Sequence, residues 1–187
     1  MNLKLPTLYK KLLLLALVFG PIVWLMFTDD GQRRTDTMVL WLFGEKEIKM
    51  DLQLLDQRFS EAELKQVYPD LEWQCQNRAT AYGDRVCVSR IGVFNGIPAR
   101  YITFFFQQEG LTALKLHYRR PNHTQLQDLL RRQLGQPELE PRASPSAPTA
   151  DETLRWRTPY GMLIMKRELL NADEPALFWL AASTLAD

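Results

Sequence analysis

One uncharged, apolar run near the N-terminus constrains this chain more than any other feature. The run is Leu12–Phe27; Lys4, Lys10 and Lys11 precede it, and Asp29 and Asp30 follow it. As a helix, its 16 residues extend about 24 Å, and the hydrocarbon core of a bilayer is about 30 Å thick. We therefore predict that residues 1–30 form a short inside segment and a single transmembrane anchor.

A cleaved signal peptide is the alternative for the same segment, because it shares the basic start and the apolar centre. A cleavage site is not apparent: Pro21 follows the small residue Gly20, and Met26–Asp29 offers no A-x-A pattern. The flanking charges are nearly balanced, since Arg33, Arg34 and Lys46 follow the run. We expect an inner-membrane, single-pass protein whose C-terminal domain is periplasmic or equivalently extracytoplasmic.

The remaining chain is electrically neutral. Lys and Arg number 23 in all and Asp and Glu 22; without the three anchor lysines and the two aspartates after the run, 20 of each remain. Nucleic acid binding requires a concentrated positive face, so we do not expect it. The pairs Arg119-Arg120 and Arg131-Arg132 are interpreted as solvated surface, with a docking patch as the alternative.

Two cysteines, Cys75 and Cys87, are separated by 11 residues. In an exported domain an even count predicts a disulfide, and separate buried thiols are the alternative. A redox pair would require C-x-x-C. Only His117 and His123 could add imidazole ligands, and neither has metal-site spacing relative to the cysteines. We expect no metal and no cofactor.

Residues 31–58 are predicted to form a membrane-proximal stalk or hairpin. Met38–Phe43 is apolar, and in Ile48–Leu54 apolar and polar residues alternate, as in a strand with one buried face. Gly44–Lys46 would supply the turn between them. Met38–Phe43 could instead lie in the membrane interface.

Residues 59–187 are predicted to form one α+β extracytoplasmic domain. Ser60 and Glu63 match a capping box for a helix that ends before Pro69, and Thr124 and Gln127 match a second one, for a helix that ends at Gly135. Proline-rich residues 137–150 predict a mobile loop. The expected strands are Leu71–Cys75, Arg85–Arg90, Ala99–Gln107, Leu111–Tyr118, Leu154–Thr158, Met162–Arg167 and Ala176–Ala182.

Antiparallel hairpins with two helices packed on one face form a two-layer sandwich. The capped helix that ends in Leu134-Gly135-Gln136-Pro137, followed by antiparallel strands, resembles the BamE and β-lactamase-inhibitor-protein group of small envelope modules over about residues 59–182. The resemblance implies a non-catalytic protein that binds other proteins. Unlike BamE, this chain has an apolar helix in place of an acylated cysteine.

The sequence contains no G-x-S-x-G, H-E-x-x-H, phosphate-loop or C-x-x-C motif, so we do not expect an enzyme. We predict a membrane-anchored module that binds or helps assemble a membrane or envelope protein complex. The alternatives are a small-ligand carrier, with a cavity lined by Tyr101, Phe105 and Trp156, and a hydrolase with paired carboxylates in a non-standard site. The possible partner surface comprises Val93, Phe94, Asn95, Ile97, Pro98, Arg119 and Arg120; the alternative is that the apolar members cover the end of the sheet.

Overall fold

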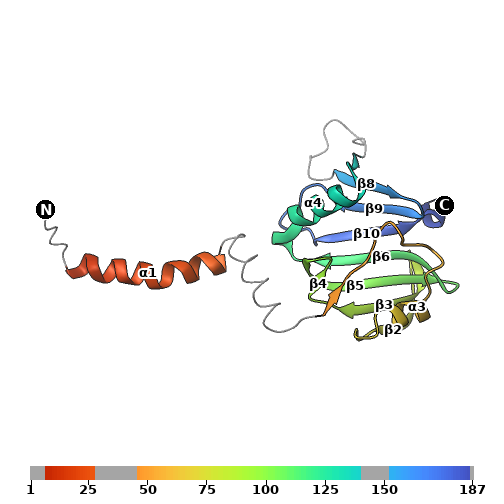
Figure 1. Ribbon diagram of the computed structural model, residues 1–187, viewed down its shortest axis with the longest axis horizontal. Coiled ribbons are helices and arrows are strands. Elements are labelled where there is room, and N and C mark those ends of the chain that lie inside the picture. Colours follow the sequence, from red (N-terminus) through yellow and green to blue (C-terminus); the bar gives the residue numbers. More distant parts are fainter. Residues whose placement is uncertain (1–6, 28–45, 140–151, 186–187) are drawn as a thin grey trace. The chain divides into compact units, whose positions relative to one another are not determined.

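The computed structural model describes residues 7–27, 46–139 and 152–185 (Figure 1). The chain divides into two compact units, Met1–Phe43 and Gly44–Asp187. The first unit contains helix α1 (Thr7–Phe27). Among the residues whose placement is described, no helix combines the length and apolar character needed to cross a bilayer. The predicted span Leu12–Phe27 is therefore not supported by the structure.

The second unit is an α+β fold built on a mixed sheet. The strands follow the order β1-β4-β5-β6-β10-β9-β8-β7, and β3 joins β2 to β5. The main sheet is antiparallel, as predicted, and the short pair β1–β4 is parallel. The strands are β1 (Glu47–Ile48), β2 (Gln74–Thr80), β3 (Gly83–Arg90), β4 (Val93–Phe94), β5 (Ile97–Gln107), β6 (Gly110–Tyr118), β7 (Glu138–Leu139), β8 (Thr153–Thr158), β9 (Gly161–Lys166) and β10 (Ala176–Ala181).

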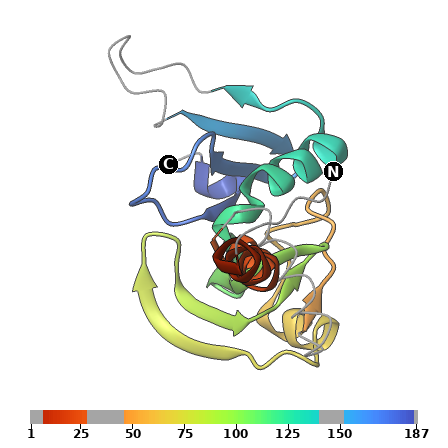
Figure 2. The same ribbon diagram turned by 90° about the vertical axis from the view of Figure 1, so that its left-hand side faces the viewer.

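Helices α3 (Glu61–Val67) and α4 (His123–Leu134) pack on one face of this sheet (Figure 2). Short 3-10 turns lie at Arg120–Asn122 and Ala182–Leu185. Because side chains alternate along a strand, each strand sends one set of apolar groups toward the helices. Across neighbouring strands this row pairs Phe104 with Leu114, Leu114 with Trp179, Trp179 with Leu163, and Leu163 with Trp156. All five are essentially buried and form the centre of the core.

The start of α3 confirms its predicted capping box. Ser60 Oγ accepts a hydrogen bond from the Glu63 backbone N at 3.2 Å, and the Ser60 backbone N donates to Glu63 Oε2 at 2.8 Å. Two of the donors that a helix leaves unpaired at its N-terminus are thereby satisfied. Leu64, one turn further on, is fully buried in the core.

The predicted cap of the second helix was wrong. α4 begins at His123, after the 3-10 turn that contains Pro121, and its N-cap is Asn122, two residues before Thr124 and without a side-chain bond. Gln127 is buried and donates to the Arg167 carbonyl at 2.8 Å instead of closing a capping box. The Asn122 side chain is 1% exposed and donates from Nδ2 to Gln125 Oε1 at 3.0 Å.

The segment before α3 belongs to the core of the second unit. Ile48, Leu52 and Leu55 are buried in the same cluster as the sheet residues. The alternating strand predicted for Ile48–Leu54 reduces to β1, which pairs with β4, followed by turns. Met38–Phe43 and residues 140–150 of the predicted loop lie outside the described residues.

The predicted disulfide is confirmed: Cys75 on β2 and Cys87 on β3 are direct cross-strand partners and are bonded. Cys87 is fully buried, and Cys75 packs at the border of the core. The bond therefore ties edge strand β2 to a strand whose neighbour, β5, is at the centre of the sheet.

We expect the double substitution Cys75→Ser with Cys87→Ser to lower the free energy of unfolding by about 2–3 kcal/mol, because the unfolded chain regains the entropy of an open loop. Urea unfolding monitored by tryptophan fluorescence measures this. Reductant should lower the free energy of unfolding of the wild-type protein by a similar amount. It should leave that of the double variant unchanged. Equal midpoints for all samples would contradict the expectation.

Candidate functional site

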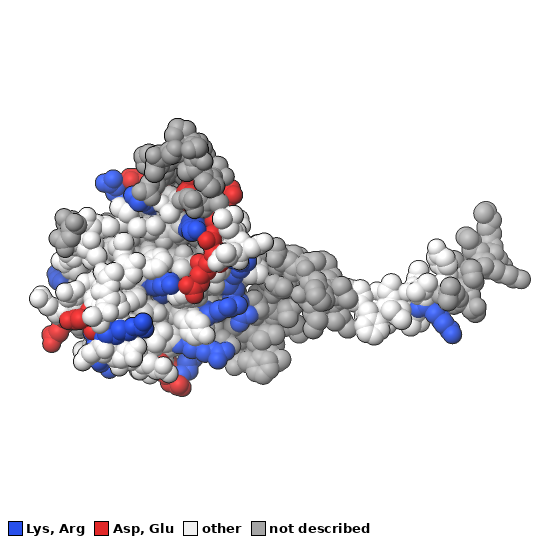
Figure 3. Space-filling model, turned by 180° about the vertical axis from the view of Figure 1, so that it is seen from behind, with Lys and Arg blue, Asp and Glu red and all other residues white. Residues whose placement is uncertain are grey.

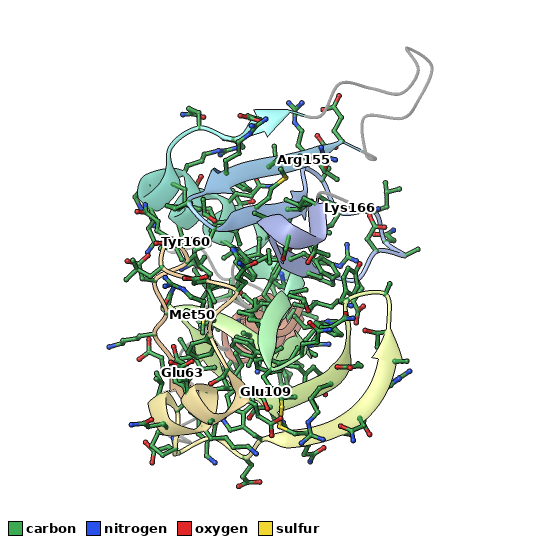
Figure 4. The ribbon with its side chains drawn as sticks, turned by 90° about the vertical axis from the view of Figure 1, so that its right-hand side faces the viewer. Met50, Glu63, Glu109, Arg155, Tyr160 and Lys166 are labelled. Atoms are coloured by element: carbon green, nitrogen blue, oxygen red, sulfur yellow. A yellow bond between two sulfur atoms is a disulfide. The ribbon has the colours of Figure 1, made fainter. Side chains whose placement is uncertain are left out.

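The sheet has a second face, which we call the open face, because α3 and α4 both pack on the other one. Lys166 lies on the open face, whereas Met50 and Glu63 lie on the helix side (Figure 4). Figure 3 views the open face and shows uncharged surface between acidic and basic side chains. The open face carries six partly exposed apolar residues from the four strands β3, β5, β9 and β10: Val88, Phe105, Met162, Ile164, Phe178 and Leu180.

Tyr82, at the turn between β2 and β3, folds over part of the open face. Its ring lies 5.3 Å from the Phe105 ring and 6.0 Å from the Phe178 ring, centroid to centroid. The next residue, Gly83, has φ +152°, and a Cβ there would meet the Phe106 carbonyl oxygen at 2.4 Å. Glycine is therefore required at this position for β3 to approach β5 and bring Tyr82 over the sheet.

A charged cluster lies on the same face beside the aromatic rings. Glu174 accepts from Lys115 Nζ at 3.2 Å and lies 3.0 Å from His117 Nδ1. Burial raises the pKa of Glu174, but Lys115 and His117 outweigh it, so the net pKa is lowered. Burial and the Lys115 charge lower the pKa of His117, against the opposing effect of Glu174. At neutral pH the cluster therefore holds a neutral imidazole and an ion pair.

Arg120 positions the loop that carries Glu174. Its guanidinium donates to the carbonyl oxygens of Leu170 at 2.9 Å and Asn171 at 3.3 Å, and also to that of Asp173. Asp173 in turn binds Lys166 Nζ at 2.7 Å. Arg120 was predicted to lie on a partner surface, and the structure instead shows its donors directed into this loop. Arg119 is half-buried next to it.

A groove opens at the end of the open face near the start of the second unit. It has a volume of about 600 Å³ and is lined by residues that include Lys46, Glu72, Gln74, Val88, Arg90 and Tyr101. Tyr101 also packs edge-on against His117, with ring centroids 6.3 Å apart. The groove therefore adjoins the charged cluster through Tyr101, and we take the two together as the candidate binding site. Of this set, only Tyr101 and His117 were considered as functional residues in the sequence; Lys46 was interpreted there as a flanking charge and part of a turn.

The apolar members of the predicted partner surface are largely buried. Phe94 and Ile97 are at most 2% exposed, Pro98 is buried, and Val93 is partly buried. They pack into the core together with Ile48, so the alternative, that they cover the end of the sheet, describes them correctly. A surface made of Phe94, Ile97 and Pro98 is therefore not available to a partner in this fold.

Asn95 has a structural role at the same turn. Its Oδ1 accepts from the Met50 backbone N, and its Nδ2 donates to the Met50 carbonyl, each at 2.8 Å. The side chain thus imitates the pairing of a neighbouring strand and joins segments 45 residues apart. Its φ of +47° is in the left-handed region, which asparagine tolerates better than most residues.

The geometry favours neither of the two alternative functions. Trp156 is 2% exposed on the core side, whereas Tyr101 and Phe105 lie on the open face, so these three do not line one cavity. Glu61 and Glu109 border a common hollow, but Arg85 and Lys65 bind Glu61 and lower its pKa to about 2. A carboxyl held ionised in this way is a poor proton donor near neutral pH.

One group of side chains within the described residues has the proximity expected of metal ligands. Ligand atoms of Glu61, Cys75 and Cys87 lie within 4.8 Å of one another. The two sulfurs are joined in the disulfide and are not thiolates, and Glu61 is bound to Arg85. These partners satisfy the group without an ion.

His123 lies in a half-buried polar cluster on the helix side. Its Nδ1 is 2.6 Å from Tyr118 Oη, and its Nε2 is 3.1 Å from the Arg167 carbonyl oxygen and 2.9 Å from Gln127 Nε2. Burial lowers the pKa of His123, and the nearby Arg120 charge lowers it further, against the effect of the Arg167 carbonyl. The cluster is therefore stable with a neutral imidazole and joins β6, α4 and the end of β9.

Comparisons with family models, with curated proteins and with solved structures find no match. The resemblance to BamE and the β-lactamase-inhibitor proteins gains no support from them. The open face, the groove and the charged cluster are the features of this fold that bear on its function.

We expect Asn95→Ala to lower the free energy of unfolding by about 2 kcal/mol, because it removes two partly buried hydrogen bonds and leaves a residue with a Cβ in the left-handed region without the side-chain bonds that compensate there in asparagine. Asn95→Gly, the matched control, loses the same two bonds but tolerates the backbone. The free energy of unfolding measured in urea should be highest for the wild type, lower for Asn95→Gly and lowest for Asn95→Ala. Wild-type stability in both would show that the Asn95–Met50 contact is unimportant.

Acidification between pH 7 and 5 should destabilise the protein. The pKa values of His117 and His123 are lowered from 6.5 on folding, so the unfolded chain binds more protons and stability falls as pH drops below about 6.5. Each histidine contributes a slope of at most about 1.4 kcal/mol per pH unit. Glu61 acts in a separate window, from 4.5 down to about 2.

Urea unfolding at several pH values between 7 and 5 measures this slope. His123→Gln should give a shallower dependence than wild type, as should His117→Gln. A folded His123→Gln variant with the wild-type slope would show that His123 is not a source of the effect.

Proposed function

We propose that this chain is a membrane-anchored, non-catalytic module that binds, or helps assemble, a membrane or envelope protein complex on the extracytoplasmic side. The observation that carries the binding role is the open face: six partly exposed apolar residues gathered on one face of a sheet whose other face is packed by two helices. Contiguous apolar surface of this kind is typical of interaction sites.

The anchor is supported by the sequence run Leu12–Phe27 and by the exposure of α1. Between Leu12 and Leu17 the leucines are 56–71% exposed on all sides of the helix. A helix that is apolar all round needs a lipid or protein environment. Together with the uncharged length of the run, this favours a bilayer as the solvent of the segment.

The extracytoplasmic side is supported by the disulfide. A disulfide persists in oxidising compartments and is rare in the cytosol. The neutral balance of charge outside the anchor is consistent with a partner that is not nucleic acid.

Membrane attachment is tested by alkaline extraction of membranes from cells that make the full chain. We expect the wild-type protein to stay in the pellet and the double variant Leu14→Lys with Leu17→Lys to be released, because a charge at the centre of a span costs about 2.5–3.5 kcal/mol per residue. Gln133→Lys with Gln136→Lys, which adds the same charge to exposed positions of the second unit, is the control and should stay in the pellet. Release of the wild-type protein would remove the anchor from the proposal.

The binding role is tested in the same cells by photo-crosslinking from Phe178 on the open face, with Gln133 on the helix side as the control position. A discrete adduct with a membrane or envelope protein from Phe178 and not from Gln133 supports the role. Equal or no adducts from the two positions would contradict it.

A further inference from the structure

Arg90 lines the groove, and Arg100 adjoins it, because the Ile91 backbone N of the lining donates to the Arg100 carbonyl oxygen at 3.0 Å; neither cation has an acidic partner among the described residues. Arg90 and Arg100 are exposed, and no ion pair within residues 46–139 and 152–185 includes either one. Within residues 46–139 and 152–185 the Lys46 ammonium pairs with Glu72, at 3.4 Å, and the Glu72 side chain is 93% exposed. Such an exposed pair contributes little stability, so Lys46 can exchange Glu72 for another carboxylate. The site therefore has positive charge that the fold itself does not neutralise.

A β-bulge presents two of the residues at this end of the sheet. In the β5–β6 pair, Ala99 lies opposite Tyr118 and Tyr101 lies opposite His117, so Arg100 is the extra residue. In a regular strand, one of two successive side chains would face the core. Here Arg100 and Tyr101 are both exposed, Tyr101 by 47%. Bulges that redirect side chains in this way are frequent beside binding sites.

The groove continues into the edge of the main sheet. Gln74 lines the groove and is also the first residue of β2. Among the described strands β2 pairs only with β3, so its other edge presents backbone donors and acceptors along seven residues. An extended chain that lies in the groove can therefore pair with β2 as it leaves, as in other cases of strand addition.

We propose that the groove and the free edge of β2 bind an acidic, extended segment of a partner polypeptide. Its carboxylates pair with Arg90, Arg100 and Lys46, its apolar or aromatic side chains contact Val88 and Tyr101, and its backbone pairs with β2. A polypeptide accounts for the charge, the apolar lining and the free edge together, whereas a lipid headgroup or phosphate uses only the charge. The inference rests on the proposed binding function and names the chemistry of the partner.

The test uses the full-length protein in nanodiscs of zwitterionic phosphatidylcholine and three fluorescent peptides: alternating Val-Glu, Val-Gln and Val-Lys octamers. We expect the Val-Glu peptide to bind, with an affinity that falls as salt rises, and the other two to bind at least about tenfold more weakly. Amide hydrogen exchange should slow over Gln74–Thr80 when the Val-Glu peptide is bound.

Matched charge reversals locate the site. Arg90→Glu and Arg100→Glu should each weaken binding of the Val-Glu peptide about tenfold, and Arg132→Glu, an equal change at an exposed position of α4, should leave it unchanged. Equal weakening by all three variants would show a nonspecific charge effect and overturn the proposal. Equal binding of the Val-Glu and Val-Gln peptides would also overturn it.

The remaining outcome that would contradict the proposal is that the groove binds a lipid headgroup. Nanodiscs that contain phosphatidylglycerol would then compete away the peptide in an Arg90-dependent manner, and β2 would show no protection. Failure of the peptide assay with the Phe178 adduct still present would remove the acidic-strand inference and leave the binding function intact. If the Phe178 adduct were absent as well, both the acidic-strand inference and the proposed binding function would be rejected.

Discussion

The pairing of β5 with β6 is the contact on which the rest of the second unit depends. β5 pairs with β3, β4 and β6, and β6 connects this half of the sheet to β10. The pair sends Ile102, Phe104, Leu114 and Leu116 to one side, where they meet α3, α4 and the Ile48–Leu55 segment. Removing this apolar row from water is the main favourable contribution to such a fold, and it decides which face is left open.

The residues of the open face are a consequence of burying this apolar row. Strand alternation that places Phe104 and Trp179 in the core places Phe105 and Phe178 on the opposite side. Two features modify this second face: Tyr82 folds over its aromatic rings, and Arg120 holds the loop that brings Glu174 to Lys115 and His117. An apolar centre bounded by a charged cluster and a groove has the composition of a binding surface.

Local features of the sequence predicted much of the fold. The capping box at Ser60 depends on residues three positions apart, and the alternation in Ala99–Gln107 and Leu111–Tyr118 reports two faces directly. The functional surface was harder to predict. Phe94 and Ile97 form an apolar turn in the sequence, but Ile48 and Leu52, far away in the chain, bury them. Asn95 joins Met50, and Arg120 holds a loop about 50 residues later; no local pattern reveals such partners.

By itself the sequence determined the elements whose signals are local: the apolar N-terminal run, the cap of α3, the end of α4 at Gly135 and the period-two strands. The two cysteines, in a domain predicted to be extracytoplasmic, also predicted the Cys75–Cys87 disulfide. Only the tertiary structure decided which polar groups satisfy one another and which remain free for a partner. Whether Arg120 or Arg90 has acceptors depends on segments brought together by sheet pairing, and that pairing is set by burial of the whole core and not by any neighbouring residue.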